Sequence, residues 1–444
     1  MSKTLIKNAK IVNEGQIIES DLLISNGRIE KIAPNITPTN EEVIDAKGKY
    51  LLPGAIDDQV HFRDPGVTYK ADIYTESRAA VAGGITSFME MPNTVPNTLT
   101  QELLEDKYQL GATKSLANYS FYMGASNENI EEVLKTDKEK VCGVKVFMGS
   151  STGNMLVDSE KTLTNIFSKV DHLIATHCED EATIRKNTAI FKEKYGDDMP
   201  IKYHPQIRNN EACYLSSSLA VRLAKKHGTR LNILHLSSAE EMDLFDNTIP
   251  LAEKKITAEV CIHHMWFTDE DYDEKGTYIK WNPAVKSQND QDAIWKAIKD
   301  GRIDVIATDH APHTAEEKDN NYWDAPSGGP LVQHAMPALF DFYHQGKISL
   351  EDIVQKICHN VAIAFKVRER GYIREGYWAD LMLVDLDSPW KVTKSNILYK
   401  CKWSPFEGHK FKSSITHTFV NGNLVYENGK VIEGTNGERL LFNN

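Results

Sequence analysis

The stretch "IDDQVHFRDPG", residues 56–66, is the starting point for interpreting the chain. An apolar run ends in Gln59-Val60-His61, and Arg63 and a Pro-Gly turn follow it. Alternate side chains of a strand point to the same face, so Gln59 and His61 can be directed at one metal ion. Glutamine, however, is a poor ligand for a transition metal. The stretch alone leaves three interpretations open: a metal site, a degraded metal site or an ordinary strand end.

Short apolar runs alternate with amphipathic segments through the middle of the chain. Residues 74–84, 211–228 and 289–301 have helical patterns. Eight strands alternating with helices over about 300 residues favour a (β/α)8 barrel, an α/β fold. The alternative, a doubly wound open sheet, is less favoured because no GxGxxG motif follows the first run. The expected strands are Ala55–His61, Ile85–Met91, Asn118–Met123, Gly143–Met148, His172–His177, Leu231–His235, Lys255–Cys261 and Asp304–Asp309.

Both ends of the chain have strand patterns instead. Near the N-terminus, apolar and polar residues alternate around a hairpin signal at Asn26-Gly27. The C-terminal end has similar signals at Asn421-Gly422 and Asn428-Gly429. We therefore expect a small β-sandwich domain built from both termini. The expected domains are residues 1–50 and 371–444 for the sandwich and residues 51–370 for the TIM-like barrel.

Composition narrows the functional classes. The chain has 444 residues, of which 41% are hydrophobic and 26% charged, so we expect a sizeable core. It has no apolar run of roughly 18 residues and no signal-peptide pattern at its start, so we expect a cytoplasmic protein without a membrane partner. The net charge of −12 argues against nucleic acid as a partner. The six cysteines are scattered without a CxxC pair, which argues against disulfides and zinc ribbons.

Polar residues close or occupy five of the expected strands. In a barrel the strand ends converge on the face that carries active sites. Imidazole and carboxylate groups suit zinc, which lowers the pKa of a bound water to about 7. An aspartate beside such a water can accept or return a proton. The five residues are His61, Lys145, His177, His235 and Asp309.

Lys145 is the unusual member of this set. A buried ammonium is costly and does not bind a cation. Two interpretations remain: Lys145 pairs with a carboxylate such as Asp309, or carbon dioxide carbamylates it. Carbamylation would turn the cation into an anion whose two oxygens can bridge two metal ions.

At these motifs the chain resembles the amidohydrolase superfamily and, within it, the dihydroorotases. The resemblance covers essentially the whole chain and implies a metal-dependent barrel enzyme. The segments that carry it are "LLPGAIDDQVHFRDPG" (51–66), "AAVAGGITSFMEMPNTVPNT" (79–98), "GVKVFMGSSTGNM" (143–155), "IATDHAPHTAEEK" (306–318) and "EGYWADLMLVDLD" (375–387).

The resemblance implies roles for the metal-binding residues, position by position. His61 and Asp309 would bind the more exposed metal, and His177 and His235 the more buried one. Carbamylated Lys145 would bridge them. We expect one zinc ion and leave a second open.

The resemblance also implies a substrate site. Arg63 and Asn93 would bind a substrate carboxylate, because guanidinium suits bidentate carboxylate recognition. His313 would add a contact, and Asn282 would hydrogen-bond the ring or ureido group. Three of these residues have a plainer alternative: an ion pair for Arg63, a turn for Asn93 and a loop position for Asn282.

Two positions depart from the family pattern. Gln59 stands where the family has the first histidine of His-x-His, so its role as a ligand is in doubt. Lys286 stands where the family often has arginine. His263, His264 and His310 receive no ligand role.

The expected reaction is the reversible cyclisation of N-carbamoyl-L-aspartate to dihydroorotate in pyrimidine synthesis, by a zinc-bound hydroxide mechanism with Asp309 as proton shuttle. Loops 149–155 and 313–329 are candidate covers for the substrate. One alternative is a hydantoinase, dihydropyrimidinase or allantoinase. Another is a weakly active scaffold for a partner carbamoyltransferase. By analogy with such enzymes we expect a homo-oligomer.

Overall fold

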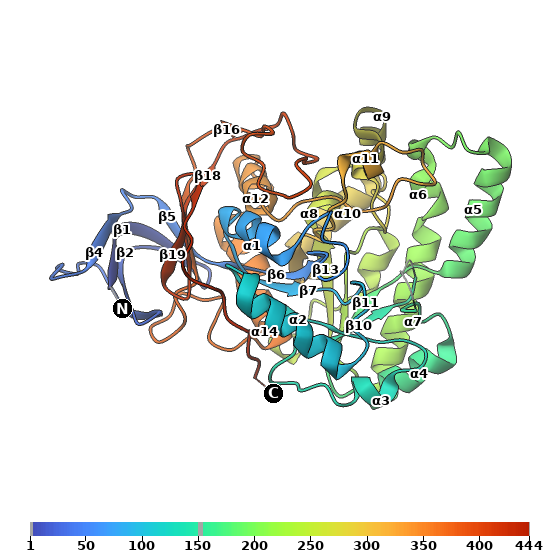
Figure 1. The fold of residues 1–444 in the computed structure, drawn as a ribbon, viewed down its shortest axis with the longest axis horizontal. Helices are drawn as coiled ribbons and strands as arrows, with labels where there is room; N and C mark the ends of the chain where they lie inside the picture. The colour runs from blue at the N-terminus through green and yellow to red at the C-terminus, as the bar shows by residue number, and fades with distance from the viewer. Residues whose placement is uncertain (1–2, 150–153, 444) are drawn as a thin grey trace.

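The computed structural model describes residues 3–149 and 154–443. Figure 1 shows a barrel surrounded by helices on one side of the molecule. On the other side, strands from the two ends of the chain lie together, the blue N-terminal strands beside the red C-terminal ones. Among the described residues, no helix is both long and apolar enough to cross a membrane.

The barrel strands confirm the expected alternation. Neighbouring strands pair in parallel, and a parallel bridge between Val60 and His310 joins the first strand to the end of the last. The third expected strand is divided at Tyr122 into two short strands. The strands are β6 (Ala55–Val60), β7 (Ile85–Glu90), β8 (Asn118–Phe121), β9 (Met123–Gly124), β10 (Val144–Phe147), β11 (Ile174–His177), β12 (Leu231–Ile233), β13 (Ile256–Cys261) and β14 (Val305–Ala307).

Helices follow the strands around the barrel, and polar caps fix where several of them begin. Asp72 caps the first helix by accepting from the Thr75 backbone N–H at 2.8 Å. The helices are α1 (Ile73–Ala82), α2 (Gln101–Lys114), α3 (Ile130–Val133), α4 (Glu160–Lys169), α5 (Glu181–Tyr195), α6 (His204–Ile207), α7 (Asn210–His227), α8 (Ile262–Trp266), α9 (Tyr272–Lys275), α10 (Gln288–Lys299), α11 (Ala315–Lys318), α12 (Ala335–His344), α13 (Leu350–Val354) and α14 (Asn360–Phe365).

Short helical turns complete the connections. A π-helical turn, η6 (Gln355–His359), joins α13 to α14. The remaining turns are 3₁₀ helices: η1 (Ile201–Tyr203), η2 (Glu240–Leu244), η3 (Leu251–Glu253), η4 (Asp269–Asp271) and η5 (Gly276–Ile279).

Both ends of the chain together build the added β domain, as predicted, and its nine strands hydrogen-bond into one sheet. Its order is β20-β19-β18-β15-β5-β1-β2-β3, with β4 paired to β1. The halves meet where β5 and β15 pair antiparallel. A separate two-stranded ribbon joins β16 (Trp390–Lys391) and β17 (Lys410–Phe411). The sheet strands are β1 (Thr4–Asn13), β2 (Gln16–Ser25), β3 (Arg28–Ala33), β4 (Glu42–Asp45), β5 (Tyr50–Pro53), β15 (Leu381–Asp385), β18 (Ser414–Val420), β19 (Asn423–Glu427) and β20 (Lys430–Val431).

The last residues of the chain return to the barrel. Leu440 and Phe442 are buried in one apolar cluster with Ile56 of β6 and Tyr122. Strand β5 also runs across the expected boundary at residue 50. The division into residues 1–50, 51–370 and 371–444 therefore stays a prediction.

Candidate active site

A cavity of about 440 Å³ lies at the carboxyl ends of the barrel strands. The side chains that line it lie as far apart in the sequence as Gln59 and Gly328, so folding brings distant motifs together there. All ten residues that the sequence singled out line it: Gln59, His61, Arg63, Asn93, Lys145, His177, His235, Asn282, Asp309 and His313.

Three of these residues have left-handed backbone conformations. The φ angles are +65° at Arg63, +39° at His235 and +48° at Asp309. Such conformations are uncommon for residues with a side chain, cost of order 1–3 kcal/mol each and cluster at functional sites. The fold thus holds three cavity side chains in orientations that a relaxed strand would not give.

His61 and Asp309 form the first polar pair. His61 Nδ1 lies 2.8 Å from Asn93 Oδ1, an acceptor, so this nitrogen carries the ring proton. Burial lowers the pKa of His61, which favours the neutral ring. Its Nε2 lone pair then faces Asp309 Oδ1 at 3.2 Å. Two lone pairs that face each other need a proton or a cation between them.

His177 and His235 form the second pair. His177 Nε2 donates to Glu179 Oε2 at 2.8 Å, which leaves Nδ1 as the acceptor, 2.9 Å from His235 Nε2. Among the described residues, the buried His235 Nδ1 has no hydrogen-bond partner. If the His235 ring proton lies on Nδ1, the lone pairs of His177 Nδ1 and His235 Nε2 face each other, and a cation between them would satisfy both.

Lys145 lies near both pairs, since the charge of Asp309 acts on its pKa and its own charge contributes to the lowered pKa values of His177 and His235. Burial lowers the pKa of Lys145 itself to about 8. Nowhere in residues 3–149 and 154–443 do three His, Cys, Asp or Glu side chains gather closely enough to hold a metal ion. The nitrogen and oxygen donors come in two pairs, so a third donor must be of another kind. A carbamate on Lys145 would supply such oxygens, and the residues fit a metal on that condition.

Glu179 and Arg208 support the second pair, and the sequence did not indicate either. Burial alone would raise the pKa of Glu179, but Arg208, at 2.5 Å, and His177 lower it to about 2. The carboxylate therefore remains ionised and orients the His177 ring. Glu179 lies two residues after a strand-end histidine, which was a usable signal. Arg208 follows the short helix α6 and has no comparable one.

The opposite part of the cavity is rich in donors. Arg63 Nε donates to Pro312 O at 3.2 Å, and Arg63 Nη2 lies 3.1 Å from His313 Nε2. Within the described ranges Arg63 has no ion pair with a carboxylate, so the ion-pair alternative fails. Lys70 contacts His313 Nδ1 at 2.9 Å and is balanced by Glu317. Burial lowers the pKa of Arg63 to about 10, so it stays charged at neutral pH.

Of the remaining residues that the sequence analysis discussed, one lines the cavity and others pack behind it. Asn282 lines the cavity, and its Oδ1 accepts from Ser327 Oγ at 3.0 Å. Lys286, in contrast, donates to Ser237 Oγ at 2.8 Å and does not line the cavity. His263 stacks on Trp281 with ring centroids 4.4 Å apart. The absence of a ligand role for His263 is consistent with this packing.

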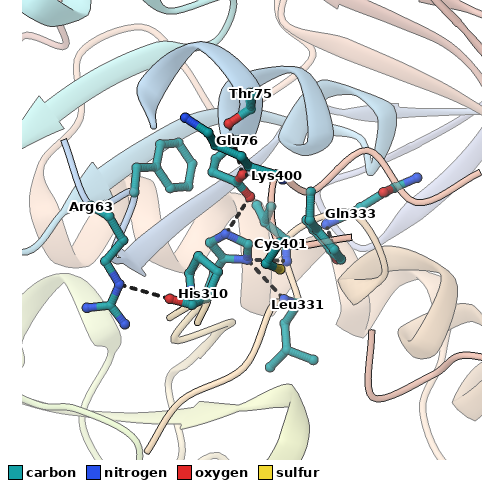
Figure 2. Close-up of polar contacts among 12 residues, drawn as sticks. Arg63, Thr75, Glu76, His310, Leu331, Gln333, Lys400 and Cys401 are labelled. Atoms are coloured by element: carbon teal, nitrogen blue, oxygen red, sulfur yellow. Dashed lines mark hydrogen bonds and ion pairs between the residues drawn. The ribbon is translucent and has the colours of Figure 1, made fainter. Parts of the chain in front are cut away.

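His310 anchors the end of β14 (Figure 2). Its Nε2 lies 2.9 Å from Glu76 Oε2, and its Nδ1 accepts from the Leu331 backbone N–H at 3.0 Å. The ring is fully buried, and the His310 carbonyl accepts from the His61 backbone N–H at 2.7 Å. His310 therefore has a structural role. It fixes the backbone that carries Asp309.

Comparison with known proteins identifies the family. Residues 50–425 match the amidohydrolase family, and the chain belongs to it. It is 34% identical over 433 residues to a dihydroorotase from Carboxydothermus hydrogenoformans, covering 95% of this chain and 98% of that protein. It is 33% identical to a dihydroorotase from Halobacterium salinarum, with the same two coverages.

Solved structures show the same fold. An L-hydantoinase (dihydropyrimidinase) from Arthrobacter aurescens superimposes with a TM-score of 0.93, at 26% identity and over 100% of both chains. A dihydropyrimidinase from Brevibacillus agri gives a TM-score of 0.86 at 25% identity, covering 97% of this chain and 96% of that one. The expected fold, a barrel with an added β domain, is confirmed.

Proposed function

We propose that the chain is a dihydroorotase, which interconverts N-carbamoyl-L-aspartate and (S)-dihydroorotate plus water in pyrimidine synthesis. The observation that carries the proposal is the cationic end of the cavity. A charged Arg63 lies there without a carboxylate partner among the described residues, beside His313 and Lys70. An anionic group of the substrate would complete this end, and the curated relatives named above are dihydroorotases.

Substrate orientation falls to Arg63, Asn93, His313 and Asn282. The Asn93 Oδ1 atom is occupied by His61, so its NH₂ group is the part that can donate to a substrate. Arg63 supplies a planar guanidinium for the carboxylate that both substrates carry. Fixing the substrate in this way holds its reacting groups in position for ring closure.

Asp309 moves the proton. In hydrolysis its carboxylate accepts a proton from the attacking water and returns it to the ring nitrogen that leaves. In synthesis it accepts the proton of the ureido nitrogen as this nitrogen attacks the side-chain carboxyl carbon of N-carbamoyl-L-aspartate. The same carboxylate thus serves both directions, and water carries away the oxygen that is lost on ring closure.

We propose zinc as the metal, held by His177, His235 and carbamylated Lys145, with His61 and Asp309 available to a second ion. When bound, zinc supplies Lewis-acid polarisation of the reacting carbonyl. The pKa of Lys145, about 8, leaves part of the amine neutral at neutral pH, and only the neutral amine reacts with carbon dioxide. Carbamylation also removes the ammonium charge that would repel a metal from this part of the cavity.

We also propose a cytoplasmic location. All six cysteines are free thiols, five of them buried, which suits the reducing cytoplasm. A homo-oligomer is proposed by analogy alone, and a carbamoyltransferase remains open as a partner.

A substrate panel distinguishes a dihydroorotase from an enzyme of the hydantoinase type. The similarity to the hydantoinase structure favours the hydantoinase type. We expect kcat/KM of the zinc-loaded protein for dihydroorotate to exceed that for dihydrouracil at least about a hundredfold, because dihydrouracil leaves Arg63 unpaired. Arg63→Met should remove most of this preference. Equal or higher kcat/KM for dihydrouracil or hydantoin would assign the chain to the hydantoinase type. No turnover of any substrate would favour a scaffold.

A further inference from the structure

Gln59 lies near the end of β6, and both polar atoms of its amide have a hydrogen-bond partner. It is 1% exposed and lines the cavity. Its Nε2 donates to Asp309 Oδ1 at 3.1 Å, 250 residues away in sequence. Its Oε1 accepts from Cys261 Sγ at 3.6 Å. The side chain thus connects the ends of β6, β13 and β14.

The neighbours determine which way the amide points. Burial raises the pKa of Cys261 well above that of an ordinary thiol, so the sulfur keeps its proton and acts as a donor. This S–H is shared with Glu259 Oε1, also at 3.6 Å. With the amide reversed, its oxygen would face the Asp309 carboxylate and its NH₂ group would face the thiol. The first contact would be repulsive and the second would be only a weak N–H···S hydrogen bond, so the amide oxygen is directed away from Asp309.

The contact restrains the carboxylate of Asp309. Both polar contacts that the described residues make with this carboxylate involve Oδ1, one from Gln59 and one with His61 Nε2. Oδ2 is therefore the oxygen left for proton transfer in the cavity. The backbone is held as well, because Asp309 has a φ of +48° and precedes the anchored His310. Gln59 supplies a side-chain restraint to match this backbone restraint.

We propose that Gln59 is a positioning residue, which holds Asp309 for proton transfer through its amide N–H and is not a metal ligand. The proposal rests on the proposed function of Asp309. It assigns a role to the departure from the His-x-His pattern. Where the family has a metal-binding histidine, this chain has a glutamine that donates a hydrogen bond to Asp309.

Two nearly isosteric substitutions separate a positioning role from a ligand role. Gln59→Met removes the donor and keeps the volume. We expect kcat to fall roughly 10- to 100-fold, with KM within about twofold and the same zinc content per chain as wild type. Gln59→Glu replaces the donor with a second carboxylate beside Asp309. If Gln59 positions Asp309, this variant should have a kcat at or below that of Gln59→Met. If Gln59 were a ligand, the carboxylate would bind zinc more tightly and preserve kcat.

Controls keep the test independent of folding and of the proposed function. Gln291→Met makes the same change at a buried glutamine of α10 that donates to Phe267 O, and its kcat should equal that of wild type. Thermal unfolding identifies variants that do not fold. If either Gln59→Met or Gln59→Glu does not fold, the other variant tests the role of Gln59. Asp309→Asn gives the kcat expected for complete loss of the shuttle.

If wild type converts neither dihydroorotate nor N-carbamoyl-L-aspartate, the proposed function is wrong, but the role of Gln59 can still be tested. A zinc titration of wild type and Gln59→Met then decides whether Gln59 is a ligand. Equal zinc stoichiometry and affinity in wild type and Gln59→Met keep Gln59 out of the ligand set. Loss of a zinc ion in Gln59→Met, or an unchanged kcat in an active enzyme, would overturn the inference.

Discussion

Asp309 combines a strained backbone with a restrained side chain. Its φ of +48° is a conformation that aspartate and asparagine tolerate better than most residues. Its carboxylate is nearly buried and lies between Gln59 and His61. This arrangement suits a group that must accept and return a proton at a fixed position.

Asp309→Asn tests the shuttle without disturbing the backbone. The amide cannot accept the proton, so we expect kcat to fall about 10²- to 10⁴-fold. The melting temperature should stay close to that of wild type, because asparagine fits the same φ. Steady-state kinetics together with thermal unfolding measure both. A kcat within tenfold of wild type would contradict the assigned role.

His61, Lys145, His177, His235 and Asp309 were predictable because each lies in or near the end of an expected strand, and the barrel brings strand ends together. The substrate-binding residues were predicted from the family resemblance instead. Gln59 was recognised as unusual, but its partners were not: Asp309 and Cys261 are 250 and 202 residues away. Arg208 was missed for the same reason, since only the folded chain brings it to Glu179. Spacing along the chain indicates which side chains reach a cavity. It does not indicate which of them hydrogen-bond there.

At the scale of elements, the loop after α11 is tied down by two buried lysines. Lys280 Nζ donates to Tyr322 O and Ala325 O, both at 2.6 Å. Lys318 Nζ donates to Pro326 O at 2.8 Å and to Gly328 O at 2.9 Å. The loop 313–329, which stays a candidate cover for the substrate, is thus bonded to two buried lysines and contributes His313 and Ser327 to the cavity wall. Most of the other candidate cover, 149–155, lies outside the described residues.

Lys280→Met tests this wall through pH. Burial lowers the pKa of Lys280 from 10.5 to about 8, so the folded protein binds fewer protons than the unfolded chain between these values. The stability of wild type relative to Lys280→Met should therefore rise as pH increases from about 8 to 10.5, by up to roughly 3 kcal/mol. Urea unfolding across this range measures the difference. Parallel pH profiles would contradict the assignment.

Helices and strands were predicted where the pattern is strong. The expected helices at 74–84, 211–228 and 289–301 correspond to α1, α7 and α10. The division of the third strand at Tyr122 was not predicted, because a strand's hydrogen bonding depends on its neighbours more than on its own residues.

At the scale of the whole molecule, the two ends of the chain serve both parts of the fold. The turn signals predicted a β domain built from both ends, and the pairing of β5 with β15 joins its N- and C-terminal halves. The last residues instead pack on the barrel, where the Phe442 backbone N–H donates to Glu139 O at 3.0 Å. Two short apolar side chains, Leu440 and Phe442, carry too little pattern to indicate this contact from sequence.

The net charge and the cavity charge differ in sign, and both suit the proposed reaction. The chain carries a net charge of −12, yet the charged Arg63, which has no carboxylate partner among the described residues, makes one end of the cavity cationic. A local cationic end selects a small anionic substrate, whereas the net charge disfavours large anionic partners.

The most direct test of the account is the approach to equilibrium from both sides with one zinc-loaded preparation. N-carbamoyl-L-aspartate and dihydroorotate are incubated separately, and both compounds are quantified over time. We expect the two reactions to converge on the same mixture, and a chelator-treated sample to convert neither compound. If the zinc-loaded, folded protein converts neither compound, the proposed function is wrong.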